Sequence, residues 1–381
     1  MGEMIRMKIG ILTLPIAENY GGILQAVALY RLLDAQEHDV VLIYKQSTNT
    51  QVWWKKIIKE ILLKIPFHNF RNMKNNNKLN EARLERKKFH RPFIEKEIFK
   101  ISEDLYTKQD LENFAKKENF DAVIVGSDQV WRKAYINDKY YKSYFLDFVD
   151  GSKTKKIAYA ASFGKDFWEG KGDSQEIAKL LQDFVAVSVR ESSGVVICKD
   201  TFDYDKAVHV LDPTMLMSKE FYKDEIIAKY DAVNTNAGGL LTYVLDEAEE
   251  KKEIIEFVQK SADMKSVHHL KGFDSSQVTY SVPQWLASFA NADAVVTDSF
   301  HGMVFSIIFE KDFVVIGNEG RGMDRFVSLT TKLGLEERLV FDVKDLEGKE
   351  LEKIDYSRVN MILNSEKKKS LEFLMGALHG E

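Results

Sequence analysis

The chain has 381 residues, of which 45% are hydrophobic and 12% aromatic, and this is enough apolar mass for two hydrophobic cores. Its formal net charge of −5 differs from the positive net charge that is typical of nucleic-acid-binding domains. A single cysteine, Cys198, excludes a disulfide framework and a cysteine metal cluster, and is typical of the reducing cytosol. No apolar run approaches the ~20 residues that span a bilayer as a helix.

The first half of the chain alternates short apolar runs with helical periodicity. Lys8–Leu14 is predicted to be a buried strand, Ile23–Leu33 carries apolar residues at helical spacing, and Val40–Tyr44 is predicted to be a second strand. This strand–helix–strand order favours parallel pairing through a right-handed crossover. A further helix is predicted at Ile177–Phe184. Further buried strands are predicted at Ala122–Val125, Ile157–Ala161 and Val185–Val187.

The second half repeats this pattern. Strands are predicted at Val208–Leu211, Leu240–Leu245, Lys265–His268, Ala294–Thr297 and Phe313–Ile316. Helices are predicted near Glu247–Ala262, Pro283–Ala290 and Gly302–Phe309. We therefore expect an α/β fold of two doubly wound, Rossmann-like domains that face each other across a cleft, as in the GT-B architecture. One large sheet is the alternative.

The domain boundary is placed where the second series of strands begins. We expect an N-terminal domain over residues 1–205, with a basic helical insertion at about 50–100, and a C-terminal domain over residues 206–381. Asp212-Pro213 is the candidate for the crossing between the two domains. The last helix of the chain is a candidate to pack back on the N-terminal domain.

Residues 51–100 break the α/β pattern, with 14 lysines and arginines against five glutamates and no aspartate. Within residues 52–65, tryptophans and isoleucines alternate with lysines, which is typical of an amphipathic helix in an anionic membrane interface. The alternative is a helical insertion that packs on the N-terminal domain with a solvated lysine face. We expect a cytoplasmic protein, and the first interpretation places it at the inner face of the membrane.

The most informative segment is Val295–Met303. A buried strand is predicted to end at Thr297 and a helix to begin at about Gly302, so His301 lies at the carboxyl end of a strand and beside a helix N-terminus. Free backbone N–H groups at a helix N-terminus favour an anion. A histidine there can exchange a proton near neutral pH, although a cap or packing residue is the simpler interpretation of a histidine taken alone.

Seven motifs, spread in order over roughly residues 8–340, resemble those of the polysaccharide pyruvyl transferase family. They are Asn19-Tyr20-Gly21-Gly22 with Leu24-Gln25-Ala26, Phe120-Asp121-Ala122 through Gly126-Ser127-Asp128-Gln129-Val130-Trp131, Ala158–Gly164, Ser188-Val189-Arg190-Glu191, Leu211-Asp212-Pro213-Thr214, Thr297–Gly302 and Arg321–Arg325. The resemblance implies a transferase that moves the enolpyruvyl unit of phosphoenolpyruvate onto a sugar as a pyruvate ketal. The basic segment lies outside the resemblance.

Phosphoenolpyruvate carries a carboxylate and a phosphate, so its site needs planar cations that bind in a bidentate manner. The resemblance implies this role for Arg190, Arg321 and Arg325, and Ser299 is a further candidate for donor binding. It also implies a functional role for His301, which we expect to protonate the methylene carbon of the donor. Asp128 or His301 itself would take up the hydroxyl protons, and the role of Asp128 is inferred only from its position.

The remaining candidates are expected to line the cleft or to contact the acceptor. They are Asn19, Tyr20, Gly21, Ser127 and Ser162. The expected partners are phosphoenolpyruvate as co-substrate and a sugar acceptor, with a lipid-diphosphate carrier as one form of the acceptor. We expect no nucleic acid, no cofactor and no required metal; magnesium held through substrate phosphates stays open.

Structural alternatives exist for several of these residues. Arg190 could pair with Glu191 or Asp212, Asp298 could cap the following helix, and Asn19 could hold its turn by a local hydrogen bond. For Arg321 and Arg325, the alternative is a surface ion pair in a glycine-rich loop. Two other functions also remain open: a GT-B-type glycosyltransferase that uses a nucleotide sugar, and a catalytically silent sugar-binding relative.

Overall fold

The computed structural model of the chain describes residues 6–16, 19–46, 85–136, 139–170, 172–232, 238–246, 248–271, 280–317, 322–348 and 352–380. The basic segment 52–65 and Arg321 lie outside the described residues.

The first sheet has six parallel strands, whose buried Val, Ile and Ala side chains cover both faces as parallel sheets require. In spatial order they are β2 (Asp39–Ile43), β1 (Lys8–Leu12), β3 (Ala122–Val125), β4 (Lys155–Ala161), β5 (Ala186–Val189) and β6 (Val208–His209). The helices connected to this sheet are α1 (Tyr20–Asp34), a helix over 85–97, α4 (Lys108–Glu118), α5 (Lys133–Ile136), α6 (Ser174–Gln182) and α7 (Ser192–Phe202).

The second sheet has five parallel strands and its own set of helices. In spatial order the strands are β11 (Leu339–Val340), β10 (Asp312–Ile316), β9 (Ala294–Thr297), β7 (Leu240–Val244) and β8 (Val267–Lys271). The helices are α8 (Glu249–Ser261), α9 (Val282–Asn291), α10 (Phe300–Ile308) and α11 (Asp324–Leu333). Two separate sheets show that the fold is the GT-B-like pair of α/β domains and not one large sheet.

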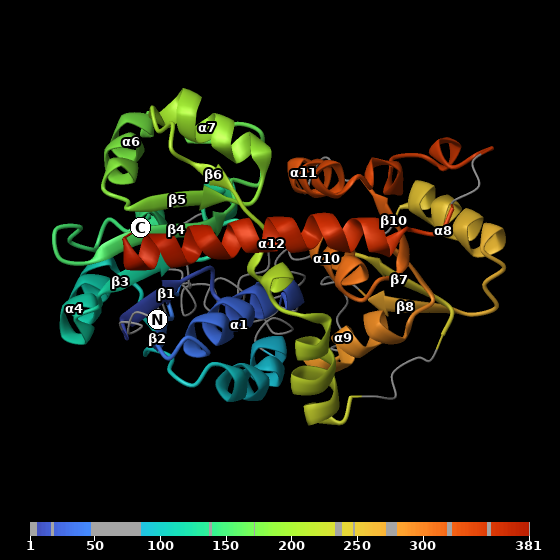
Figure 1. Cartoon of the computed structure of the whole chain (residues 1–381), viewed down its shortest axis with the longest axis horizontal. Coiled ribbons are helices and arrows are strands. Elements are labelled where there is room, and N and C mark those ends of the chain that lie inside the picture. The colour runs from blue at the N-terminus through green and yellow to red at the C-terminus, as the bar shows by residue number, and fades with distance from the viewer. Residues whose placement is uncertain are drawn as a thin grey trace, which may run out of the picture.

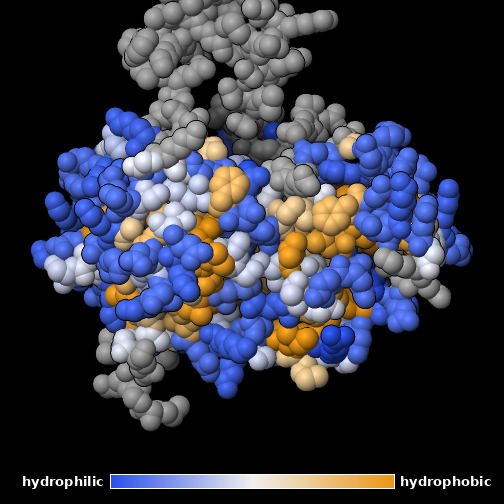
Figure 2. Space-filling model, turned by 90° about the horizontal axis from the view of Figure 1, so that it is seen from above, coloured by the Kyte–Doolittle hydropathy of each residue, from blue (hydrophilic) through white to orange (hydrophobic). Residues whose placement is uncertain are grey.

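The two halves share a hydrophobic core. One cluster of buried side chains includes Ile9 and Leu29 from the first half and Trp285 and Phe305 from the second, while two further clusters each pack against one half. Figure 1 shows the two sheets side by side, with the last helix, α12 (Tyr356–His379), crossing both of them. The face shown in Figure 2 carries many hydrophilic residues, with apolar patches on both sides of it. The shared core therefore fixes how the carboxyl edges of the two sheets face each other.

The ends of α12 contact different halves of the molecule. At its start the Tyr356 hydroxyl donates a hydrogen bond of 2.5 Å to the carbonyl oxygen of Lys311, just before β10. Near its end the Lys155 ammonium of β4 donates a hydrogen bond of 2.6 Å to the carbonyl oxygen of Leu378. The helix thus begins on the second half and ends on the first. The domain boundary after residue 205 stays a prediction.

One strand lies in a different sheet from the one predicted. Val208–His209 pairs with β5 at the edge of the first sheet, whereas the sequence pattern assigned Val208–Leu211 to the second half. The reason is that α7, which the apolar periodicity did not reveal, returns the chain to the first sheet and adds one more parallel strand. Asp212-Pro213 then begins the connection toward β7, because Asp212 caps a short 3-10 helix at Pro213–Leu216 that packs on α1.

Candidate active site

The predicted site residues follow strands of both sheets at their carboxyl ends, the edge at which open α/β sheets bind ligands. Asp128 follows β3, Arg190 follows β5, and His301 follows β9 in the first turn of α10. Gly21 lies in the first turn of α1, which follows β1. Arg325 lies in the first turn of α11. The fold brings these five residues together at the junction of the two halves.

The centre of this cluster is the carboxylate of Asp212. Its Oδ2 accepts hydrogen bonds from Arg190 Nη1 at 2.7 Å and from Ser127 Oγ at 3.0 Å. The same oxygen lies 3.6 Å from Nε2 of His301. Its Oδ1 accepts hydrogen bonds from the backbone N–H and the hydroxyl of Thr214. Asp212 therefore links a cation of the first half to the histidine of the second.

The electrostatics of this carboxylate follow from its partners. Burial alone would raise the pKa of Asp212, but the nearby imidazole of His301, the charge of Arg190 and the hydrogen bond from Thr214 hold that pKa well below its usual range. Asp212 is thus ionised throughout the physiological pH range.

The guanidinium of Arg190 is only partly satisfied by its neighbours. Its Nε lies 3.5 Å from Glu191 Oε1 and its Nη2 lies 3.9 Å from Asp128 Oδ1, and neither atom makes a hydrogen bond to any described residue. The guanidinium also lies 4.7 Å from the centre of the Phe300 ring. Burial would lower the pKa of Arg190, but the charges of Asp212, Glu191 and Asp128 raise it. Arg190 thus holds Asp212 through one nitrogen and keeps the Nε–Nη2 edge of its fork for another acceptor.

His301 is positioned by the N-terminus of α10. Ser299 is the N-cap, and its hydroxyl accepts a hydrogen bond of 3.3 Å from the backbone N–H of Gly302. The imidazole is 6% exposed and meets the Phe300 ring edge to face. Nε2 faces Asp212, whereas a Cβ atom at Gly21 would lie 1.9 Å from Nδ1. The histidine of the second half therefore packs directly against the first turn of α1.

This first turn of α1 also joins the two halves through Tyr20. The Asn19 side chain accepts hydrogen bonds from the backbone N–H groups of Gly21 and Gly22, so Asn19 holds the turn locally, as the alternative interpretation proposed. The Tyr20 ring stacks on Trp285 of α9 with centroids 5.2 Å apart, and its hydroxyl donates a hydrogen bond of 2.9 Å to the carbonyl oxygen of Tyr280. The turn is thereby fixed against the second half.

Arg325 lies on the other side of Phe300. Its guanidinium is 5.4 Å from the centre of that ring, and its Nε donates a hydrogen bond of 3.4 Å to the carbonyl oxygen of Gly322. Burial, together with the charge of Arg190, lowers the pKa of Arg325 to about 10. Two guanidinium groups from different halves thus lie close to the same aromatic ring. Arg325 is only 8% exposed, so the alternative of a surface ion pair does not apply to it.

Two other predicted positions have structural roles. The Ser162 hydroxyl donates a hydrogen bond of 2.5 Å to Glu191 Oε1, which orients that carboxylate beside Arg190. Asp298 does not cap α10. Its carboxylate accepts hydrogen bonds from the backbone N–H of Leu245 and from the Lys251 ammonium, and so holds the segment that follows β7. Ser299 is the cap because its hydroxyl lies one residue closer to the helix.

The sequence interpretation did not assign a site role to Asp212, Glu191 or Phe300. Asp212 was quoted within the motif Leu211–Thr214, and the signal that could have identified it is a carboxylate directly after a strand. Phe300 was part of the His301 block. The sequence does not indicate the contact between the two halves, because Arg190 and Phe300 lie far apart along the chain.

Metal clusters and membrane-spanning helices are both absent from the part of the chain that the structure describes. No group of three or more His, Cys, Asp or Glu side chains there is arranged to hold a metal ion. Among the helices of the described ranges, none is both long and apolar enough to cross a membrane.

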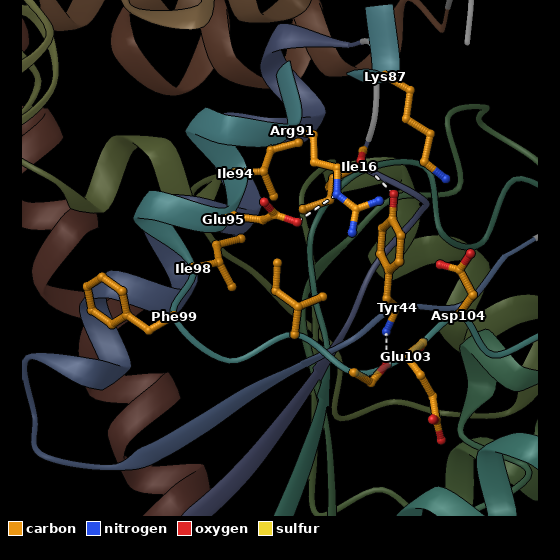
Figure 3. Close-up of a pocket in the computed structure, with 12 residues that line it drawn as sticks. Ile16, Tyr44, Lys87, Arg91, Ile94, Glu95, Ile98, Phe99, Glu103 and Asp104 are labelled. Carbon is orange, nitrogen blue, oxygen red and sulfur yellow. Dashed lines mark hydrogen bonds and ion pairs between the residues drawn. The ribbon is translucent and has the colours of Figure 1, made fainter. Parts of the chain in front are cut away.

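A pocket of about 400 Å³ lies at the carboxyl end of β2, apart from the charged cluster. Figure 3 shows the Arg91–Glu95 ion pair beside the Tyr44 ring, on the same side of it as Ile94 and Ile98. The Tyr44 hydroxyl donates a hydrogen bond of 3.1 Å to the carbonyl oxygen of Ile16. None of the predicted site residues lines this pocket. The candidate catalytic residues are instead those of the cluster around Asp212.

Comparisons with known proteins agree with this architecture. The family model described as polysaccharide pyruvyl transferase matches residues 19–320. No curated protein sequence matches the chain. Among solved structures, Arabidopsis thaliana UGT89C1 complexed with UDP-L-rhamnose is similar with a TM-score of 0.53 and 8% identity, over 98% of this chain and 100% of that one. The UDP-GlcNAc 2-epimerase of Neisseria meningitidis has a TM-score of 0.48 and 10% identity, over 97% and 100%.

Proposed function

Because the chain belongs to the polysaccharide pyruvyl transferase family, we propose that it transfers the enolpyruvyl group of phosphoenolpyruvate to a sugar of a glycan or glycan precursor, as a pyruvate ketal and with release of phosphate. The observation that carries this proposal is the buried Nε–Nη2 edge of Arg190, which lacks a hydrogen-bond partner among the described residues and lies in one cluster with His301. A guanidinium edge of this kind suits a carboxylate or a phosphate.

The charges around the cluster bear on donor binding. Within the described residues, three carboxylates (Asp128, Glu191 and Asp212) accompany the guanidinium groups of Arg190 and Arg325. Burial raises the pKa of Glu191, while the charge of Arg190 and the hydrogen bond from Ser162 oppose that rise. We propose that Arg190 and Arg325 bind the donor together with Arg321, which lies outside the described residues, and with Ser299.

The proposed reaction begins with proton transfer. The imidazolium of His301 protonates the methylene carbon of phosphoenolpyruvate, and the π electrons of its double bond form the new C–H bond. The central carbon becomes electrophilic, and a sugar hydroxyl attacks it while a base accepts the hydroxyl proton. The bond from this carbon to the phosphate oxygen then breaks, and a second hydroxyl closes the ketal. In balance, one C–H and two C–O bonds form and the C–O bond to phosphate breaks. Of the two hydroxyl protons, one replaces the proton that His301 gave up and the other leaves with the phosphate.

The base in this scheme is Asp128 or the neutral form of His301. Asp128 lies beside Arg190 and has a φ of 80°, an uncommon backbone angle for a residue with a side chain. Its Oδ1 accepts a hydrogen bond of 2.9 Å from the backbone N–H of Gln129. We propose that the acceptor lies along the edge formed by Asn19, Tyr20 and Gly21. Ser127 and Ser162 were also predicted for the acceptor, but both are fully buried and donate hydrogen bonds to Asp212 and Glu191. No cofactor or metal enters this scheme.

A nucleotide-sugar glycosyltransferase is the alternative on the same fold, and fold likeness alone does not separate the two functions. The deciding experiment incubates the full chain with phosphoenolpyruvate and a panel of glycosides and follows phosphate release and product mass. We expect phosphate release that depends on the glycoside, and a product that carries a pyruvate ketal. Transfer of a sugar from UDP-sugars, with no consumption of phosphoenolpyruvate, would support the alternative.

Substitution of Arg190 by lysine tests donor binding. Lysine keeps a positive charge near Asp212 but cannot supply the planar edge of Nε and Nη2. We expect KM for phosphoenolpyruvate to rise by roughly 10-fold or more, the effect of losing about 1.4 kcal/mol of binding. KM is measured by steady-state kinetics at varied concentrations of phosphoenolpyruvate, and thermal unfolding checks that the variant is folded. An unchanged KM and kcat would remove Arg190 from the donor site.

Peripheral membrane contact through residues 52–65 is a separate proposal, which rests on sequence alone. Each lysine near an anionic surface contributes about 1 kcal/mol, and this attraction weakens as salt rises. We expect the protein to sediment with anionic vesicles more than with neutral ones, and less so after Trp53 and Trp54 are both replaced by serine. Equal recovery with both kinds of vesicle, or with neither, would contradict membrane contact and leave the insertion alternative.

A further inference from the structure

We propose that Asp212 is a positioning residue for His301, holding the proton on Nε2 so that Nδ1 is the nitrogen that exchanges a proton in the reaction. The inference rests on the proposed function for its catalytic consequence. Its structural part concerns one tautomer in the free protein. Of the two nitrogens of His301, Nε2 lies 3.6 Å from Asp212 Oδ2 and makes no closer polar contact among the described residues.

The argument begins with how firmly Asp212 is held. Four hydrogen bonds fix its carboxylate: those from Arg190 and Ser127 to Oδ2, and the two from Thr214 to Oδ1. One of these, from the backbone N–H of Thr214, also caps the 3-10 helix that begins at Pro213. A carboxylate with this many donors is an oriented acceptor and cannot turn away from the imidazole without losing them.

The second step concerns the imidazole. An ionised carboxylate only accepts hydrogen bonds, so the nitrogen that faces Asp212 has to carry a proton in both the neutral and the cationic ring. The proton that the ring gains and loses is then the one on Nδ1. Gly21 is the residue next to that nitrogen, and only a residue without a side chain leaves room there, since a Cβ would lie 1.9 Å from Nδ1.

The third step weighs the charges that surround the ring. Asp212 follows β6, Arg190 and Glu191 follow β5, Asp128 follows β3, and Arg325 on α11 lies across Phe300. The α1 turn presents Gly21 and Tyr20, which carry no charge at neutral pH. Arg190 opposes a positive imidazole, and Asp212 is the carboxylate within 4 Å of it among the described residues. Removal of the Asp212 charge should therefore make His301 harder to protonate.

Asp212→Asn removes this charge and keeps nearly the same shape. Without the neighbouring negative charge the imidazolium is less stabilised. We therefore expect the basic limb of the kcat/KM profile, where a general acid loses its proton, to move to lower pH. Thr214→Val is the matched control, because it removes one hydrogen bond to Asp212 but leaves the charge.

The experiment is ¹⁵N NMR of the full chain with labelled histidine, in which the His301 signals are assigned with His301→Gln. We expect wild-type His301 to be neutral at high pH as the Nε2–H tautomer, and its titration to shift in Asp212→Asn but little in Thr214→Val. An Nδ1–H tautomer in the wild type would overturn the inference, whether or not the variant folds. An unshifted titration in Asp212→Asn would also overturn it.

The NMR measurements need no substrate, so a failure of the positioning role can be distinguished from a failure of the proposed function. If the tautomer and the shift are as expected but phosphoenolpyruvate is not consumed, the positioning role stands and the proposed function is wrong. If phosphoenolpyruvate is consumed and the pH profile of Asp212→Asn is unchanged, the positioning role is wrong and the function stands.

Discussion

Substitution of His301 by glutamine should lower kcat for phosphate release by about 10²- to 10⁴-fold, the usual contribution of a general acid or base. Glutamine fills most of the imidazole volume and can donate a hydrogen bond toward Asp212, but it cannot transfer a proton near neutral pH. Because the side chain is 6% exposed and packs on Gly21 and Phe300, truncation to alanine would also leave a void. Glutamine is therefore the cleaner test.

The control for this prediction is binding of phosphoenolpyruvate to the inactive variant. If His301 acts in proton transfer, donor affinity measured by calorimetry should stay within a few-fold of wild type while kcat falls. Arg190 and Thr214 still hold Asp212 in the variant, so we expect the melting temperature to change little. Near wild-type turnover in His301→Gln would show that the acid is another group.

The fold was largely predictable because its strands are buried on both faces. Runs such as Ala122–Val125 and Ala294–Thr297 stand out as continuous apolar segments, and the structure has β3 and β9 at these positions. Strand β6 was assigned to the wrong sheet because a strand of two residues shows no clear apolar alternation. The apolar periodicity of α7 is also weak, because Gly194 lies on its buried side and Val196 is exposed. Sheet membership depends on the crossover between strands, which the apolar pattern did not reveal.

The site was predictable only in part. His301 and Arg190 follow strands within recognisable motifs, so their positions at the carboxyl edge could be inferred. Their immediate partners could not be inferred. Asp212 contacts His301 although 89 positions separate them in the sequence, and Arg190 contacts Phe300 only because the two halves pack together. Local sequence determines which edge a residue occupies, whereas the packing of the halves decides what it faces there.

Substitution of Gly21 by alanine should disturb the site more than any other single methyl group added to the α1 turn. The new Cβ would lie 1.9 Å from His301 Nδ1 and 2.2 Å from Cγ, closer than any real contact, so the ring or the turn has to move by at least about 1 Å. Overpacking of this kind costs about 1–3 kcal/mol. A displacement of about 1 Å at a reacting group can lower the rate about 10²-fold. We expect a lower melting temperature and a similar fall in kcat.

Gly22→Ala provides the matched control one residue along the same turn. A Cβ there would lie 3.3 Å from Asp128 Oδ2 and 3.5 Å from Asn19 Cβ, contacts that a shift of a few tenths of an ångström relieves. Alanine is also a better helix former than glycine by about 1 kcal/mol, and this gain applies equally to both positions. The difference between the two variants therefore isolates the contact with His301. If Gly21→Ala and Gly22→Ala showed the same melting temperature and the same kcat, the close packing of the α1 turn on His301 would not exist in solution.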